Sequence, residues 1–183
     1  MATGTTVTTF PIRVLGALAL DTTIYEEVEA DRTATGQAML VVVLSSLSAG
    51  IGGMGLSSGS LKNIPFISGV ALLSWAAWAM VTFQIGAKLM PEPQTRADVG
   101  ELLRTIGFSA APGMLRVFGI VPGATIPAFA ITAVWMLAAM VVAVRQALDY
   151  KSTARAIAVC ALGWALAIGI AVGLGLAFSP PVS

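Results

Sequence analysis

Arg116 is the most conspicuous chemical group in this sequence, because it lies in an otherwise apolar stretch. The stretch reads RTIGFSAAPGMLRVFGIVPG, residues 104–123, and Arg116 precedes Pro122 by six positions. In a helix this places its Cα about 9 Å from the helix end, which a guanidinium can span by snorkelling. Since the apolar runs contain no Asp or Glu, the expected partners are lipid phosphates or the carbonyls of Ile120 and Val121. Arg116 is therefore a candidate lipid or anion contact, with a simple interfacial anchor as the alternative.

The sequence contains few of the residue types that form catalytic or cofactor-binding sites. The chain has no histidine and a single cysteine, Cys160, which excludes His-ligated haem, Ser/His/Asp and Cys/His triads and an internal disulfide. Residues 50–55 match GxGxxG, but the pattern ends an apolar run, whereas a dinucleotide site needs it between a strand and a helix. We predict that the protein is not an enzyme and holds no metal or cofactor.

Four carboxylates precede the first long apolar run. They lack the ligand spacing of a calcium-binding loop, so a solvated face or docking against basic residues of the cytosolic rim is expected. The carboxylates are Glu26, Glu27, Glu29 and Asp31, and the basic rim is Arg96, Arg104, Arg145, Lys151 and Arg155.

The composition identifies the class of protein. Of the 183 residues, 57% are hydrophobic and 10% are charged, whereas soluble domains carry about 25% charged residues. The mean hydropathy is +0.89, so the chain is expected to be an integral membrane protein surrounded by lipids. The net charge of +1 without a long basic run argues against nucleic acid as a partner.

The elements that must position these residues are apolar helices. Four runs, 36–56, 64–88, 125–148 and 154–178, can each cross a hydrocarbon core of about 30 Å. The stretch around Arg116 supplies a fifth, because Thr95 and Asp98 fit a capping box and Pro112 interrupts the helix after it. The sequence thus predicts an all-α membrane protein, a five-helix transmembrane bundle over residues 36–178 whose third helix is broken at Pro112. Residues 1–35 are expected to form a cytosolic segment with short interfacial helices, and residues 179–183 a short tail.

The distribution of basic residues predicts the topology. With five spans and the N-terminus inside, eight Lys and Arg residues are cytosolic and only Lys62 is outside. If the third segment entered the membrane and returned to the same side, six Lys and Arg residues would be cytosolic and four would be outside. The positive-inside rule therefore favours a full crossing.

Three segments resemble the Yip1 family of five-span membrane proteins, particularly its short bacterial members, over residues 11–178. They are TIYEEVEAD, IGFSAAPGMLRVFGIVPG and VRQALDYKSTARAIAVCALGW. On this resemblance, Gly107, Phe108, Pro112 and Pro122 occupy the family's third-span positions, with Phe108 where tyrosine is usual. Eukaryotic members bind Rab GTPases and carry an Asp-Leu-Tyr-Gly-Pro motif that this sequence lacks. The resemblance implies a five-span fold, a membrane role and location in a bacterial inner (cytoplasmic) membrane.

Two stripes of small residues are candidate helix-packing sites, since small side chains let helices approach closely in lipid. One is Ser45, Ala49 and Gly53, and the other is the GxxxG pair Gly169 and Gly173. Packing within the chain is the simpler interpretation, and self-association is the alternative.

Four tryptophans, Trp75, Trp78, Trp135 and Trp164, are expected near the middle or cytosolic half of their helices. An indole N–H at that depth needs an acceptor, and the available polar side chains include Ser74, Gln84 and Ser109. Bundle packing or a lipid or small-ligand pocket between helices would account for them.

The function that follows is a non-enzymatic membrane scaffold or assembly partner, with a protein partner or a homo-oligomer. The alternative is a small transporter, channel or lipid-binding carrier for a neutral or lipidic species. A proton or cation relay is not expected, because the predicted spans contain no Asp or Glu.

Overall fold

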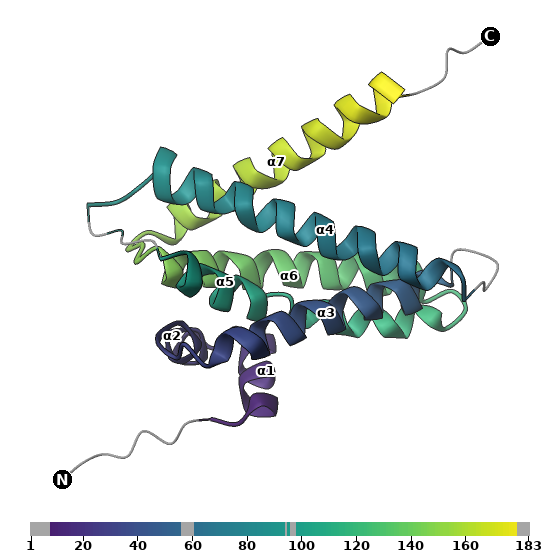
Figure 1. The fold of residues 1–183 in the computed structure, drawn as a ribbon, viewed down its shortest axis with the longest axis horizontal. Coiled ribbons are helices and arrows are strands. Elements are labelled where there is room, and N and C mark those ends of the chain that lie inside the picture. The colour runs from purple at the N-terminus through teal and green to yellow at the C-terminus, as the bar shows by residue number, and fades with distance from the viewer. Residues whose placement is uncertain (1–7, 56–60, 94, 96–97, 179–183) are drawn as a thin grey trace.

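The fold is helical throughout the part of the chain that the structure describes. A computed structural model describes residues 8–55, 61–93, 95 and 98–178, with the backbone alone for residues 167–178. Its elements, in chain order, are α1 (Phe10–Leu18), α2 (Thr22–Ala30), α3 (Ala34–Gly53), α4 (Asn63–Gln84), η1 (Ile85–Leu89), α5 (Val99–Phe108), η2 (Ala111–Ile120), α6 (Thr125–Ala147) and α7 (Thr153–Phe178). Here η1 is a π-helical turn and η2 is a 3₁₀ helix. Figure 1 shows the helices as one bundle with α1 and α2 against its side.

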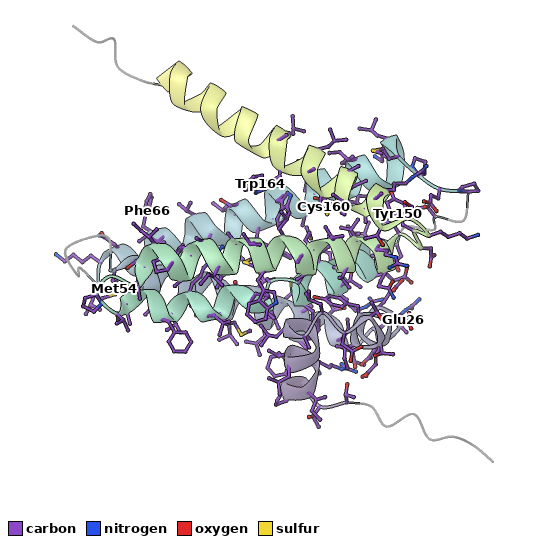
Figure 2. All side chains as sticks on the ribbon, turned by 180° about the vertical axis from the view of Figure 1, so that it is seen from behind. Glu26, Met54, Phe66, Tyr150, Cys160 and Trp164 are labelled. Atoms are coloured by element: carbon purple, nitrogen blue, oxygen red, sulfur yellow. The ribbon has the colours of Figure 1, made fainter. Side chains whose placement is uncertain are left out.

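Three helices are long and apolar enough to cross a membrane by length and composition: Ala34–Gly53, Asn63–Leu89 and Thr125–Ala147. Large apolar side chains cover their outer surfaces; Phe66 of α4, for example, is 75% exposed and points away from the bundle in Figure 2. Such surfaces are costly in water and favourable in lipid. The chain is therefore a membrane protein.

The long helices form the frame of the bundle. In Figure 1, α3, α4 and α6 run along its long axis, and α7 packs against α4 and α6 near its start and diverges toward its end. The α5–η2 segment lies between α3 and α6, and η2 has its most extensive contacts with these two helices.

The α-helical hydrogen-bond pattern of α5 ends before Pro112. Helix α5 stops at Phe108, and η2 begins at Ala111 with Pro112 in its first turn, where the missing N–H of proline costs nothing. Ten α-helical residues rise about 15 Å and ten 3₁₀ residues about 20 Å. Together α5 and η2 are long enough to run the length of the bundle.

The start of α5 differs from the predicted capping box. The helix begins at Val99, and the carboxylate of Asp98 caps it by accepting from the Gly100 N–H at 3.0 Å. The hydroxyl of Thr95 instead accepts from the N–H of Glu92 and donates to the carbonyl of Leu148. Thr95 therefore fastens the connection before α5 to the end of α6.

Contacts at the two ends of the bundle define the course of the α5–η2 segment. At one end, the Tyr150 hydroxyl lies 2.8 Å from the carbonyl oxygens of both Gly86 and Met90. At the other end, the Thr125 hydroxyl donates to the Gly119 carbonyl at 2.6 Å, beside the end of α3. We call these the Tyr150 end and the Gly119 end. The chain passes from the first to the second through α5 and η2.

A close backbone contact joins α3 to η2. A Cβ atom added to Gly52 would lie 1.9 Å from the carbonyl oxygen of Arg116, well inside van der Waals contact. Only glycine allows the two backbones to approach this closely.

Candidate functional site

A cavity of about 440 Å³ lies between α4, α6, α7 and η2. Its wall combines one cation with several large aromatic and aliphatic side chains, chiefly Trp75, Trp78, Arg116, Val134, Leu137 and Trp164. This combination of a mostly apolar wall with a few polar groups is typical of ligand-binding cavities.

Arg116 points into this wall. Its Nε donates to the Thr132 hydroxyl of α6 at 3.3 Å, and its guanidinium lies 5.2 Å from the ring centroid of Phe129, a cation–π distance. The structure thus places the side chain against α6, and not on the carbonyls of Ile120 and Val121 as the sequence suggested. Among the described residues, Arg116 forms no ion pair, and its terminal nitrogens form no hydrogen bond.

The face of α4 beside the cavity carries buried polar atoms without a partner in the described part of the chain. They are the hydroxyls of Ser68 and Thr82 and the indole N–H groups of Trp75 and Trp78. The two tryptophans line the cavity, whereas Ser68 lies against Gly50 of α3. Trp78 and Thr82 face α7 at Gly163, where a Cβ atom would lie 3.4 Å from Trp78 Nε1 and 3.1 Å from Thr82 Oγ1. An unsatisfied buried donor costs about 1–3 kcal/mol, so this face is well suited to a hydrogen-bond acceptor.

Trp135 differs from these two tryptophans because its indole N–H has an acceptor. It donates to the carbonyl of Leu18, the last residue of α1, at 2.9 Å. The acceptor is therefore a backbone carbonyl and not one of the side chains suggested by the sequence, and the Ser109 hydroxyl donates instead to the carbonyl of Ile106.

A second, more apolar cavity of about 660 Å³ adjoins the first between α6 and α7. The two share Val134, Leu137 and Trp164 in their walls. Cys160 lines the second cavity with its buried thiol, and Figure 2 shows Cys160 and Trp164 on α7 beside the α6 ribbon. An apolar trough thus continues directly from the cavity that contains Arg116.

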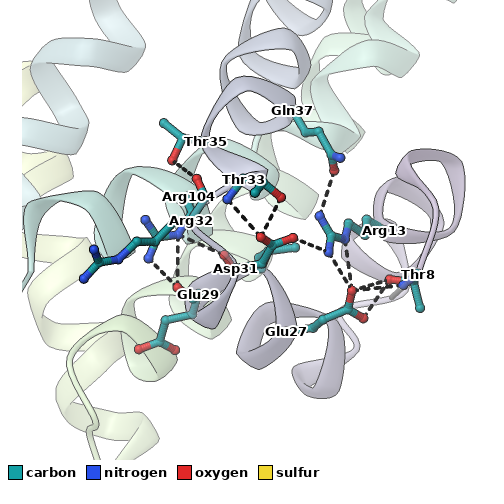
Figure 3. Close-up of polar contacts among 11 residues, drawn as sticks. Thr8, Arg13, Glu27, Glu29, Asp31, Arg32, Thr33, Thr35, Gln37 and Arg104 are labelled. Carbon is teal, nitrogen blue, oxygen red and sulfur yellow. Dashed lines mark hydrogen bonds and ion pairs between the residues drawn. The ribbon is translucent and has the colours of Figure 1, made fainter. Parts of the chain in front are cut away.

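A second polar cluster holds α1 and α2 together. Arg13 of α1 is only 1% exposed, and its Nη2 contacts Glu27 Oε1 at 2.8 Å and Asp31 Oδ2 at 2.7 Å. Its Nη1 donates to Gln37 of α3 at 3.0 Å (Figure 3). We call residues 8–33 the N-terminal module; Arg13 ties its two helices to each other and to α3.

The carboxylates of this cluster are stabilised in their charged form. Burial alone would raise the pKa of Glu27, but hydrogen bonds from Thr8 and Arg13 hold it below its usual value. Hydrogen bonds from Thr33 and Arg13 lower the pKa of Asp31 to about 2. Both groups are therefore ionised at neutral pH and pair with Arg13.

Arg104 of α5 fastens the other end of α2. It is 5% exposed, and its Nε lies 3.0 Å from the carbonyl oxygens of Val28 and Glu29, while its Nη2 also donates to the Glu29 carbonyl. These carbonyls belong to the last turn of α2, where a cation complements the helix dipole. The acidic segment does dock against a residue of the predicted basic rim, but through backbone carbonyls.

The carboxylate of Glu29 lies in a different environment from those of Glu27 and Asp31. Partial burial, followed by repulsion from Asp149, Glu101 and Glu26, raises its pKa to about 7, despite the opposing effect of Arg104. Glu29 is therefore the group in the module whose charge changes near neutral pH.

The remaining predicted site residues serve in packing and in turns. A Cβ atom at Gly107 would lie 2.7 Å from the Ala38 side chain, and Phe108 and Pro112 are buried beside the junction of α5 and η2. Pro122 is exposed in the turn before α6. These positions bring α5 close to α3, and none of them lines either cavity.

The two small-residue stripes are described to different extents. Ser45, Ala49 and Gly53 are all buried on α3, but they face different neighbours: Ser45 contacts η2 at Gly113, and Gly53 lies against Ile67 of α4. Gly169 and Gly173 lie outside the residues whose contacts are described, in the part of α7 given as backbone alone.

Comparison with known proteins agrees with this architecture. A family model described as the Yip1 domain matches residues 21–174, which run from the cap of α2 into α7. No match was found among curated proteins, and none among solved structures.

Proposed function

Because the chain belongs to the Yip1 family, we propose that it acts as a non-enzymatic membrane scaffold, a five-span protein that binds and organises other membrane components. The Tyr150 end would lie on the cytosolic side of a bacterial inner membrane, with α2 of the N-terminal module at that end and α1 packed along the bundle toward the middle of α6. The partner would be another membrane protein or a second copy of the chain.

The observation that carries this proposal is the rigid attachment of the N-terminal module to the bundle. Arg13 ties the module to α3, Arg104 ties it to α5, and Trp135 ties it to α6. The two buried arginines donate charge-assisted hydrogen bonds to acceptors at fixed positions, which favours one orientation of the module. A module fixed in this way presents a preformed surface beside the membrane, as a scaffold requires.

The five-span topology is supported by the α5–η2 segment. The connection before it is bonded to the Tyr150 end through Thr95, and Gly119 near its own end accepts from Thr125. Its length of about 35 Å exceeds the roughly 30 Å of the hydrocarbon core. With this segment counted as a span, the eight-to-one bias of basic residues supports an N-terminus on the cytosolic side.

The non-enzymatic assignment is supported by the available side chains. The sequence has no histidine, and its single cysteine is buried in the apolar trough between α6 and α7. Arg13 and Arg104 are buried and donate hydrogen bonds to α2, so they are poorly placed to bind a reacting group.

Crosslinking in cells, followed by purification in mild detergent and native mass spectrometry, tests the scaffold role. We expect wild-type protein to carry a second protein or a second copy in fixed stoichiometry. Arg13→Gln, which undocks the module, should lose it, whereas Arg32→Gln, an equal charge change at an exposed position of the same module, should retain it. Wild-type protein that remains a monomer, with or without crosslinking, would exclude the scaffold role.

A further inference from the structure

The polar groups around the Arg116 cavity have one chemical feature in common. Apart from the Ser74 hydroxyl, which can also accept, the polar groups that line it are Arg116, Trp75 and Trp78, which donate hydrogen bonds but cannot accept them. None of the described residues supplies a carboxylate to Arg116. A complementary ligand must therefore bring acceptor oxygens and negative charge.

The position of the cavity shows how such a ligand would reach it. Trp75 lies 12 residues after the start of α4, about 18 Å along the helix, which is near the middle of the bundle. Two of the lining residues, Val134 and Trp164, are 71% and 53% exposed on the outer surface of the bundle. The cavity is thus accessible sideways, from the lipid.

The adjoining trough provides for an apolar chain. Besides the three shared residues, its wall is aliphatic or small, with Ala138, Val141 and Ile157 among its members. Acyl chains bind such surfaces through many weak dispersion contacts. A ligand with a charged head and an apolar tail could therefore place its head in the Arg116 cavity and its tail in the adjoining trough.

We propose that these two cavities bind one anionic phospholipid, with its phosphate at Arg116 and the Trp75 indole and an acyl chain in the trough between α6 and α7. Free phosphate shares the head-group chemistry but would leave the trough unused. Lipid binding here is independent of the scaffold role, because it involves none of the residues that fix the N-terminal module.

Binding is measured on delipidated, detergent-purified full-length protein by native mass spectrometry. The added probes are phosphatidylglycerol, phosphatidylcholine and inorganic phosphate. We expect one phosphatidylglycerol per chain, bound at least about 10-fold more tightly than phosphatidylcholine, because the choline cation offsets the negative charge of its phosphate beside Arg116. Equal binding of both lipids would overturn the proposal, and so would competition by inorganic phosphate at millimolar concentration.

Two pairs of variants locate the lipid. Arg116→Gln should weaken phosphatidylglycerol binding about 10-fold, whereas Arg32→Gln, the same charge change on an exposed residue, should not. Ala138→Phe fills the trough and should also weaken binding, whereas Ala130→Phe, on the exposed side of α6, should not. Equal effects within both pairs would show that lipid binds the protein surface in general.

Tryptophan fluorescence gives a readout that does not depend on the arginine variant folding. Phosphatidylglycerol brominated on its acyl chains should quench wild-type fluorescence with a saturable component. That component should be reduced in Trp164→Phe, because Trp164 lines both cavities, and unchanged in Trp135→Phe, whose indole is bound to Leu18. Quenching that never saturates, or that is unaffected by Trp164→Phe, would contradict binding in the trough.

Discussion

The indole N–H of Trp135 donates a hydrogen bond to the carbonyl oxygen of Leu18, 117 residues earlier in the chain. Trp135 precedes the end of α6 at Ala147 by 12 residues, or about 18 Å. The end of α1 therefore lies beside the middle of α6, far from the Tyr150 end of the bundle. The N-terminal module packs along the transmembrane helices as well as over their ends.

Arg13→Gln should release the N-terminal module while leaving the bundle folded. Breaking a buried ion pair costs about 3–5 kcal/mol, and since Glu27 and Asp31 keep some contact with solvent, we expect about 1–3 kcal/mol here. Hydrogen–deuterium exchange should rise in residues 10–33 and remain unchanged in α4. Arg32→Gln is the matched control. Unchanged protection of α2 in Arg13→Gln would show that apolar contacts alone hold the module.

Docking of the module should strengthen as the pH falls from 8 to 6. The pKa of Glu29 in the folded protein is raised to about 7, so the folded state binds a proton more tightly than the unfolded chain. Its stabilising effect is complete below the unfolded pKa and is lost as the pH rises through about 7. Protection of α2 from hydrogen exchange should follow this profile, and Glu29→Gln should abolish the dependence.

The same measurement below pH 4 should give the opposite trend. The pKa values of Glu27 and Asp31 are lowered in the folded protein, so their stabilising effect is present above their unfolded values and is lost on acidification. A monotonic pH profile in wild-type protein would contradict the assignment of Glu29.

Gly52→Ala should destabilise the bundle, whereas Gly36→Ala on the same helix should not. A Cβ atom at Gly52 would overlap the Arg116 carbonyl, while at Gly36 nothing lies within 4 Å. Overpacking against a backbone costs about 1–3 kcal/mol, and alanine at an open helical glycine gains about 0.5–1 kcal/mol. Thermal unfolding in detergent should separate the two variants; equal melting temperatures would show that α3 and η2 can move apart.

The five-span topology is tested by cysteine labelling in a Cys160→Ala background. Leu61→Cys, before α4, should react with an impermeant thiol reagent in intact cells. Ser152→Cys, before α7, should react only after permeabilisation. Labelling of Ser152→Cys in intact cells would exclude a full crossing by α5 and η2.

The four long helices were predictable from the sequence because each coincides with an apolar run bounded by polar residues, glycine or proline. Their observed bounds lie within three residues of the predicted runs, once η1 is counted with α4. A pattern of apolar residues determines where a helix runs, since the bilayer requires every backbone group to be bonded within the segment.

The direction of Arg116 was not predictable, because it depends on the type of helix. A 3₁₀ helix turns about 120° per residue and an α-helix about 100°, so the five steps from Ala111 to Arg116 accumulate about 100° of difference. A projection that assumes an α-helix therefore points the guanidinium to the wrong side. The partners of Arg13 were not predictable either. They depend on the angle between α1 and α2, which is set by the turn at Leu20, where φ is 59°.

The attachment of the N-terminal module also has a consequence for biosynthesis. Its helices are translated first. The carbonyl of Val28 has its donor in Arg104, 76 residues later, and the carbonyl of Leu18 has its donor in Trp135, 117 residues later. At about 5–20 residues per second, the carbonyl of Leu18 is made roughly 6–23 s before Trp135. During this interval the nascent chain exposes groups that the folded protein buries, so the first segment can close onto α5 and α6 only after both have been made.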